Sequence, residues 1–396
     1  MRFALPILLG LSLATSGEPV AAPAASPYAR WTRGPSPDPA FFPIAVWLQN
    51  PAKAPRYLKA GFNTYVGLWK GPTEEQLATL KAAGMKVICD LNDVGRQHLE
   101  DPTIVGWMHG DEPDNAQPAP GGGWGPPIPP ATIVRDYERL RTADPTRPVL
   151  LNLGQGVAWD GWHGRGVRTN HPEDYPEYVR GADIVSFDIY PVTHDSPAVR
   201  GRLEFVARGV ERLVGWSDGR IVWNCIECTR ISSKTAKPTP AQVRSMVWLS
   251  LIHGSRGLIY FVHEWQPRFN ESALLDDAEM LAAVTELNRQ IARLAPVLNS
   301  TSLPPETVTV TSPEGEGRIA IMVKPAADGA WLFAVETLGR AAKARFDFGP
   351  ALTQEGSVSV SSIEAPDAPI ASDGRGFTAD FTPWEPRIYR LRRGSR

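Results

Sequence analysis

Cysteine is scarce in this sequence, with three residues among 396: Cys89, Cys225 and Cys228. A number that is both small and odd excludes a disulfide framework. Cys225 and Cys228 have the C-x-x-C spacing of redox and zinc sites. That spacing falls within a predicted strand, where residues three apart point to opposite faces, and no second pair completes four ligands. We therefore expect buried cysteines in the wall of the fold, no metal site and no cofactor.

A surplus of charge of either sign is also missing. Lys and Arg number 41 against 43 Asp and Glu, which gives a net charge of -2. A nearly balanced charge provides no long-range attraction for polyanions. We therefore expect neither nucleic acid nor an anionic membrane surface as a partner.

Long apolar runs are absent beyond the N-terminus, so no membrane-spanning helix is predicted. The N-terminus itself carries Arg2, an apolar run over 4–14 and small residues around 21–25. This order of charge, apolar core and small residues is typical of a secretory signal. It predicts a signal peptide and a short mature tail over residues 1–25, and an exported protein that is periplasmic or extracellular.

No Gly-x-Gly-x-x-Gly opens a first helix, which argues against a doubly wound dinucleotide-binding sheet. From residue 38 to 300 the sequence instead repeats a short apolar run, a polar end and an amphipathic helix. Strands are predicted at Ile44–Leu48, Thr64–Leu68, Val87–Leu91, Ile104–His109, Val149–Leu153, Ile184–Ile189, Ile221–Ile226 and Gly257–Val262. Thr73 and Gln76 have the spacing of a capping box at the start of one helix, and Gly84 ends that helix. Eight such repeats over this length predict a (β/α)8 TIM barrel over residues 38–300.

The sequence pattern changes after residue 300. Short runs, several of them alternating apolar and polar residues, follow one another with Gly, Pro and Asp between them, and no helical period interrupts them. The runs are Thr307–Thr311, Ile319–Val323, Trp331–Val335, Ala344–Phe348, Ser357–Ser361 and Ile388–Leu391. This pattern predicts a C-terminal antiparallel β-sandwich domain over residues 301–396.

Chemistry on a (β/α)8 barrel is expected at the C-terminal ends of the strands. These ends are rich in carboxylates, amides and aromatic rings, and they lack glycine loops for phosphate. The candidate residues are Trp47, Trp69, His109, Asp111, Glu112, Asn152, Asp188, Tyr190, Glu227, His263 and Trp265. Sugars present hydroxyl groups and apolar C–H faces, so polar side chains and indole rings suit them. The composition of this rim predicts a carbohydrate substrate.

Glu112 and Glu227 follow the fourth and seventh predicted strands. Cleavage of a glycosidic bond needs such a pair, one carboxylic acid for the leaving oxygen and one carboxylate for the anomeric carbon. The acid needs a raised pKa while the nucleophile stays ionised. Structural alternatives exist for each residue taken alone: Glu112 at a helix start, Glu227 paired with Arg230, and Asp188 as an acceptor inside the barrel.

These residues resemble clan A of the retaining glycoside hydrolases. Asp111-Glu112-Pro113 is similar to the clan's Asn-Glu-Pro, Glu227 and Trp265 fall where its nucleophile and substrate-stacking tryptophan belong, and Tyr190 resembles a tyrosine that contacts the nucleophile. The resemblance implies hydrolysis of a β-glycosidic bond in an oligo- or polysaccharide by double displacement. Glu112 would then be the acid/base and Glu227 the nucleophile.

Two alternatives to that mechanism stay open. Asp111 stands where the clan usually has Asn, and an adjacent Asp-Glu pair resembles β-N-acetylhexosaminidases that use the substrate's own acetamido group as nucleophile. Neighbours on a regular strand face opposite ways, so both side chains reach one site only if the strand breaks there, which Pro113 favours. The barrel could also be a catalytically silent sugar-binding module. The Pro- and Gly-rich segment 117–130 predicts a loop over the rim, with Trp124 as a further candidate contact to substrate.

Overall fold

The computed structural model describes residues 26–354, 356–365 and 368–394. The predicted export signal over 1–25 lies outside the described residues. Over the described part of the chain, no helix combines the length and the apolar character needed to cross a membrane.

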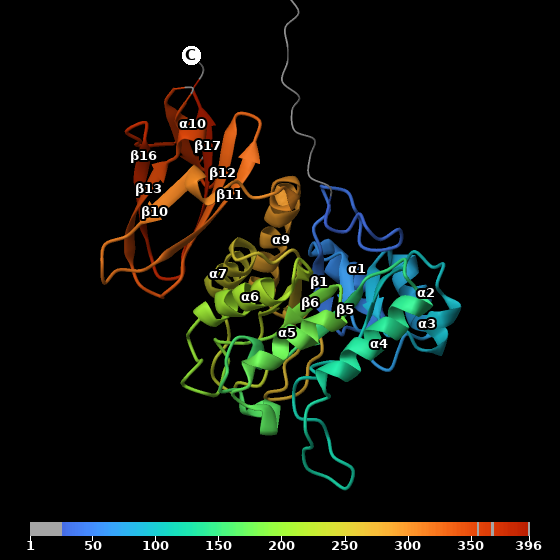
Figure 1. The fold of residues 1–396 in the computed structure, drawn as a ribbon. Helices are drawn as coiled ribbons and strands as arrows, with labels where there is room; N and C mark the ends of the chain where they lie inside the picture. Colours follow the sequence, from blue (N-terminus) through green and yellow to red (C-terminus); the bar gives the residue numbers. More distant parts are fainter. Residues whose placement is uncertain (1–25, 355, 366–367, 395–396) are drawn as a thin grey trace, which may run out of the picture.

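The first part of the chain forms a sheet of parallel strands that follow one another in sequence order. They are β1 (Ile44–Trp47), β2 (Thr64–Val66), β3 (Lys86–Cys89), β4 (Ile104–Met108), β5 (Val149–Leu153), β6 (Ile184–Phe187), β7 (Ile221–Val222), β8 (Asn224–Glu227) and β9 (Leu258–Phe261). β7 pairs with β6, β8 pairs with β9, and β9 pairs with β1. Because Trp223 alone separates β7 from β8, these two are halves of one interrupted strand, and a parallel bridge from Asp188 to Cys225 joins β6 to the second half. The arrangement fits the predicted TIM barrel (Figure 1).

Helices follow the strands and cover the outside of the barrel (Figure 1). They are α1 (Ala54–Lys59), α2 (Glu74–Ala83), α3 (Asp93–Gln97), α4 (Pro130–Ala143), α5 (Tyr175–Tyr178), α6 (Glu204–Trp216), α7 (Pro240–Ile252), α8 (Ala273–Asp276) and α9 (Ala278–Asn299). Short 3-10 turns lie at Pro51–Lys53, Gln155–Val157, His163–Arg168, Pro172–Asp174, Val179–Gly181 and Pro305–Thr307. The capping box predicted from Thr73 and Gln76 is present at α2, and Gly84 ends that helix in the left-handed conformation. Both signals were readable because they depend on local sequence alone.

Two layers of apolar side chains hold the barrel together. The larger layer lies between the strands and the helices, and a smaller one, which includes Val66, Ile88, Leu150 and Ile259, fills the interior. The indole N–H of Trp223 donates to the Tyr28 hydroxyl at 2.9 Å, and that hydroxyl donates to the carbonyl of Arg256 at 2.7 Å. These contacts close the N-terminal floor of the barrel. All three cysteines are free and buried, as expected for wall positions.

The C-terminal part of the chain contains two separate antiparallel sheets, which fit the predicted β-sandwich. One sheet has the order β10 (Val308–Thr311), β13 (Ala342–Phe348), β16 (Gly376–Phe381). The other has the order β11 (Ile319–Ala326), β12 (Gly329–Glu336), β17 (Pro386–Arg393), β14 (Val358–Ser362), β15 (Pro369–Ile370). A short helix, α10 (Pro350–Thr353), follows β13. Within the sandwich, Phe346 stacks on Phe377 at 4.7 Å between ring centroids.

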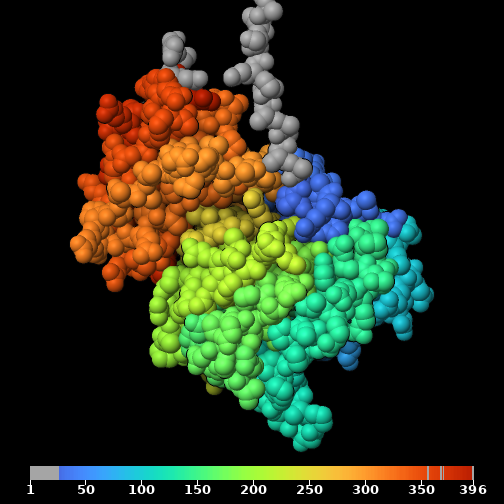
Figure 2. Space-filling view, in the orientation of Figure 1, coloured from blue at the N-terminus to red at the C-terminus, as the bar shows by residue number. Residues whose placement is uncertain are grey.

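The five-stranded sheet packs on the barrel helices α7 and α9. Trp248 of α7 stacks on Phe333 of β12, with 5.4 Å between ring centroids, and Val335 and Ile388 join the apolar layer of the barrel. Figure 2 shows the C-terminal part, in orange and red, lying directly against the yellow-green part that follows the seventh strand. The two parts therefore share an apolar interface on the outside of the barrel.

Candidate active site

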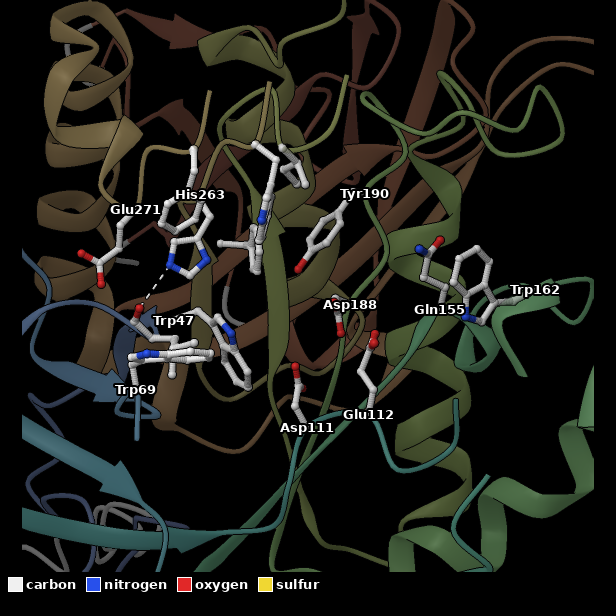
Figure 3. A pocket seen from close by; sticks show the side chains of 15 residues that line it. Trp47, Trp69, Asp111, Glu112, Gln155, Trp162, Asp188, Tyr190, His263 and Glu271 are labelled. Atoms are coloured by element: carbon white, nitrogen blue, oxygen red, sulfur yellow. Dashed lines mark hydrogen bonds between the residues drawn. The ribbon is translucent and has the colours of Figure 1, made fainter. Parts of the chain in front are cut away.

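A cavity of about 820 Å³ lies at the C-terminal ends of the barrel strands. It is lined by Trp47, Leu48, Trp69, Asp111, Glu112, Gln155, Trp162, Asp188, Tyr190, Ile231, Phe261, His263, Trp265, Phe269 and Glu271. Figure 3 shows carboxylate side chains and aromatic rings converging on it. Its size falls within the range of about 300–1,000 Å³ that is usual for small-molecule sites.

Asp111 and Glu112 both line this cavity although they are neighbours in sequence. This is possible because β4 ends at Met108, and the backbone of Glu112 has the left-handed φ of 42°. The alternation of a regular strand is therefore broken before the pair. The sequence required a break in the strand for both side chains to reach one site, and the structure has that break.

Asn152 of β5 orients two of the cavity carboxylates from below. Its amide nitrogen donates to Asp111 Oδ1 at 2.9 Å and to Asp188 Oδ1 at 3.1 Å, while its Oδ1 accepts from Ser186 Oγ at 2.8 Å. The nearest oxygens of Asp111 and Asp188 are consequently no more than two hydrogen-bond lengths apart. Asn152 is buried and lies under the cavity, so it acts on a bound molecule only through these two carboxylates.

The pKa values of all three cavity carboxylates are raised. Burial is the largest cause for each. For Asp111 the hydrogen bond from Asn152 opposes the rise, and the charge of Asp114 adds to it. The charges of Asp188 and Asp111 raise the pKa of Glu112 further, and the charge of Asp111 does the same for Asp188. Like charges in one low-dielectric site cannot all ionise together. The cluster therefore retains protons near neutral pH, and the pKa of Glu112 lies well above its usual value.

Glu112 is held from the side by a chain of hydrogen bonds. Asn115 Nδ2 donates to Glu112 Oε2 at 2.7 Å, and the indole N–H of Trp162 donates to Asn115 Oδ1 at 2.8 Å. Glu112 Oε1 has no such donor among the residues that the structure describes. One carboxyl oxygen is thus fixed, and the other is available to a molecule in the cavity.

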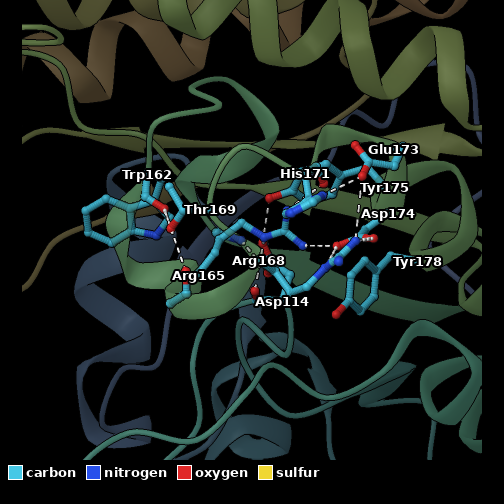
Figure 4. A network of polar contacts seen from close by, with 12 residues as sticks. Asp114, Trp162, Arg165, Arg168, Thr169, His171, Glu173, Asp174, Tyr175 and Tyr178 are labelled. Carbon is cyan, nitrogen blue, oxygen red and sulfur yellow. Dashed lines mark hydrogen bonds and ion pairs between the residues drawn. The ribbon is translucent and has the colours of Figure 1, made fainter.

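Behind Glu112 lies a buried polar network that the sequence did not predict (Figure 4). The carboxylate of Asp114 accepts from the backbone N–H of Gly154 and from the Tyr175 hydroxyl, each at 2.9 Å. Arg165 donates to the carbonyl of Asp114 at 3.3 Å and pairs with Asp174 at 2.7 Å. This network ties the loop after β5, which carries Trp162, to the loop after β4. Burial raises the pKa of Asp114 even though hydrogen bonds lower it.

The hydroxyl of Tyr190 is buried, and no hydrogen bond of standard geometry reaches it among the described residues, but Asp188 lies close enough to interact with it. It comes from the segment after β6 and points toward Asp188 in the cavity (Figure 3). Burial, followed by the charge of Asp188, raises the pKa of Tyr190 well above its usual value, so the hydroxyl keeps its proton. A buried hydroxyl that lacks a hydrogen bond of standard geometry is incompletely satisfied, and an acceptor on a bound molecule would complete it.

Aromatic rings form the other wall of the cavity. Phe261 and Trp265 stack with 5.6 Å between centroids, Trp265 is 42% exposed and Trp69 is 67% exposed. His263 lies edge-on to Trp265 and shares a hydrogen bond of 3.1 Å with the carbonyl of Leu48, so it also braces the wall. Large rings left open to a cavity indicate a ligand with apolar faces.

Glu227, the predicted nucleophile, is not among the residues that line the cavity, unlike its predicted partner Glu112. It is 0% exposed, and its Oε1 accepts from the backbone N–H of Val192 at 2.6 Å. Its Oε2 accepts from the backbone N–H and the hydroxyl of Thr193, at 3.1 and 2.8 Å. Burial raises the pKa of Glu227 to about 7 against these bonds. With hydrogen bonds to both of its oxygens from the segment after Tyr190, Glu227 supports that segment.

Three other sequence predictions also differ from the structure. His109 is buried with its Nε2 2.8 Å from the carbonyl of Gly181, outside the cavity. Arg230 pairs with Glu264 at 2.9 Å and not with Glu227. Trp124 is 76% exposed and does not line the cavity, and its loop projects from the barrel (Figure 1, teal). The predicted site residues that do line the cavity are Trp47, Trp69, Asp111, Glu112, Asp188, Tyr190, His263 and Trp265.

Some lining residues were missed because they lie farther along the loops than the strand ends. Gln155 and Trp162 follow β5, and Phe269 and Glu271 follow Trp265. The aromatic and amide character of these loops was a usable signal, but their distance from the strands gave no reason to place them over the same rim.

No protein-family description and no curated protein sequence matches this chain. Solved structures do match in fold. The α-amylase of Geobacillus thermoleovorans, in complex with acarbose, is 12% identical with a TM-score of 0.51, over 89% of this chain and 98% of that one. AmyP in complex with maltose is 9% identical with a TM-score of 0.53, over 89% and 96%. The maltogenic α-amylase AmyB of Thermotoga neapolitana is 10% identical with a TM-score of 0.51, over 90% and 99%. At these identities the likeness shows a shared fold.

Proposed function

We propose that this chain is a glycoside hydrolase that cleaves a β-linked 2-acetamido sugar. In this proposal Glu112 is the acid and base, and the substrate's own acetamido oxygen is the nucleophile. The observation that carries it is the shared cavity of Asp111, Glu112, Asp188 and Tyr190, from which Glu227 is absent. The shared fold with structures described as α-amylases, two of them with bound acarbose or maltose, supports a carbohydrate substrate.

Glu112 fits the role of general acid. Its pKa is raised well above the usual value, so the carboxyl group keeps its proton to higher pH than an exposed glutamate, and Asn115 fixes one oxygen while the other is free. The proton passes to the leaving glycosidic oxygen as the C–O bond breaks. In the second half of the reaction the same carboxylate removes a proton from water.

Asp111 and Tyr190 fit the handling of an acetamido group. Asp111, oriented by Asn152, would accept the amide N–H, and the incompletely satisfied hydroxyl of Tyr190 would donate to the carbonyl oxygen. That oxygen attacks the anomeric carbon from the face opposite the leaving group and forms a cyclic intermediate, which water then opens. The attack requires the acetamido and leaving groups to be trans, which means a β-linkage for gluco- and galacto-configured sugars, with net retention.

The decisive experiment uses matched pairs of aryl β-glycosides that differ only at carbon 2, acetamido against hydroxyl. We expect turnover of the 2-acetamido member alone, with competitive inhibition by the corresponding sugar thiazoline, which mimics the cyclic intermediate. Loss of turnover in Glu112→Gln and its retention in Glu138→Gln, an exposed residue on α4, would assign the reaction to the cavity.

Two results would overturn the proposal. Turnover of 2-hydroxy glycosides, with a 2-fluoro glycoside trapped as an ester on Asp188 or Glu227, would instead establish double displacement. Binding of glycans to the aromatic wall without turnover of any glycoside would establish a sugar-binding barrel without catalysis.

We also propose that the protein is exported, from the signal-like order of residues in 1–25. Fractionation of cells that express the full chain, with N-terminal sequencing of the product, tests this separately from the activity. Retention of the whole chain in the cytoplasm would contradict it.

A further inference from the structure

A second cavity, of about 100 Å³, lies at the end of the barrel opposite the active site. Its walls include Arg256, which precedes β9 at the barrel floor, Leu298 of α9, and Ser302 and Lys324 from the C-terminal part of the chain. It therefore lies where the barrel floor meets β11. The cavity exceeds the volume of about 30 Å³ that one water molecule occupies in the liquid.

Two cations line this cavity without an acidic partner. Lys324 is 1% exposed, and its ammonium donates to the carbonyl of Ser300 at 2.5 Å. Arg256 donates from Nη1 to the carbonyl of Leu298 at 2.8 Å. An ammonium has three N–H donors and a guanidinium has five. Each side chain uses one of them on a described residue, and no carboxylate of the described chain lies within ion-pair distance of either.

The other titratable group on the cavity wall is His253. Its Nδ1 is 2.7 Å from the carbonyl of Leu249, and its Nε2 lies 3.4 Å from Glu211, so that carboxylate is engaged by the imidazole. Burial lowers the pKa of His253. Burial, followed by the charge of Arg256, lowers the pKa of Lys324 to about 7. Lys324 is buried and Arg256 is partly buried. An anion between them would offset the repulsion between the two charges and use their free donors.

We propose that this cavity binds a small inorganic anion of the size and charge of chloride, held between Arg256 and Lys324. The anion accepts hydrogen bonds from the unused donors of both side chains. Because one cation belongs to the barrel floor and the other to β11, the anion joins the two parts of the chain. The anion lies away from the cavity that holds Asp111 and Glu112, so its binding does not depend on the proposed activity.

The test compares thermal unfolding of the full chain at pH 7 in sodium chloride and sodium gluconate at equal ionic strength. We expect chloride to raise the Tm saturably by a few degrees, as binding to the folded state alone requires. Lys324→Met should abolish this rise, and Lys343→Met, an exposed lysine of β13, should keep it. Crystals grown with bromide should show an anomalous peak within hydrogen-bond distance of both cations.

Equal Tm values in the two salts, together with no bromide peak at this position, would overturn the proposal. An equal chloride effect in the Lys324 and Lys343 variants would overturn it as well, because the effect would then arise elsewhere. If Lys324→Met does not fold, Arg256→Gln replaces it in the same comparison. Turnover of glycosides is expected to be unchanged by chloride in every variant that folds.

Discussion

Replacing Glu112 by Gln separates proton donation from binding, because the amide keeps the shape of the side chain and loses the acidic proton. Asn115 Nδ2 donates to Glu112 Oε2 in the wild type, and the amide oxygen of Gln can accept that same bond. The variant also loses a carboxyl group whose ionisation is opposed by burial and by the charges of Asp188 and Asp111. We therefore expect its Tm to equal or exceed that of the wild type.

The kinetic effect of Glu112→Gln should depend on the leaving group. General acid catalysis contributes about 10²- to 10⁴-fold, which corresponds to about 3–5 kcal/mol at 1.36 kcal/mol for each tenfold change in rate. A sugar leaving group needs the proton and should show the whole loss in kcat/KM. A dinitrophenolate leaves without a proton and should show little loss in the first step. The assay is a series of aryl 2-acetamido-β-glycosides with graded phenol pKa values, alongside a disaccharide.

The pH profile gives a second reading of the same variant. Glu112 acts while protonated, and its pKa is raised, so wild-type kcat/KM should fall as pH rises through that pKa. The same raised pKa adds stability that is complete below the unfolded value of about 4.3 and is lost as pH rises through the folded value. Glu112→Gln should remove both the alkaline limb of activity and this part of the stability slope. A uniform loss for all leaving groups, with the alkaline limb intact, would refute the assignment of Glu112 as the acid.

Three further variants test other parts of the site. Glu227→Gln turns an amide N–H₂ toward donors of the 192–193 segment, so the free energy of unfolding should fall by about 1–3 kcal/mol in urea titrations while the folded enzyme stays active. Abolished turnover with unchanged stability would instead make Glu227 a nucleophile. Tyr190→Phe removes a buried hydroxyl that makes no hydrogen bond of standard geometry, so kcat/KM should fall about 2- to 10-fold while the Tm stays level or rises. A lower Tm would show that the hydroxyl has a structural partner. Trp265→Ala should raise KM about 10- to 100-fold with kcat unchanged, from the loss of about 1.5–3 kcal/mol of apolar contact. An unchanged KM would remove Trp265 from the substrate wall.

The barrel strands were predictable because parallel strands covered on both faces are continuous apolar runs. All eight predicted runs overlap observed strands. The seventh run contains the break at Trp223, whose indole turns inward to meet Tyr28 at the floor. The residues Ile221–Ile226 contain no local signal for that break, because it depends on Tyr28, which is 195 residues away in sequence.

The side-chain directions were predictable only where strand alternation continues. His109 follows Trp107 at a two-residue interval, and Trp107 belongs to the layer between strands and helices, so its outward direction could have been read from the sequence. Glu227 follows Cys225 of the interior at the same interval, so its inward direction was expected. Its burial was not, because the segment after Tyr190 folds over it and engages both oxygens. Loop paths of this kind depend on tertiary contacts that sequence periodicity does not contain.

The pKa of a buried carboxylate in this chain depends on whether cations and hydrogen-bond donors surround it. This difference explains which carboxyl groups keep a proton. Burial opposes ionisation of Asp144 as well, but hydrogen bonds from Thr146, Trp107 and Arg147 outweigh it and lower its pKa. Among the described residues that line the active-site cavity there is neither arginine nor lysine. Burial and the charges of neighbouring carboxylates therefore prevail for Asp111, Glu112 and Asp188, and their pKa values rise. The lack of a cation favours protonated carboxyl groups in this cavity, and a lysine or arginine introduced on its wall would lower the pKa of the acid that the proposed reaction needs.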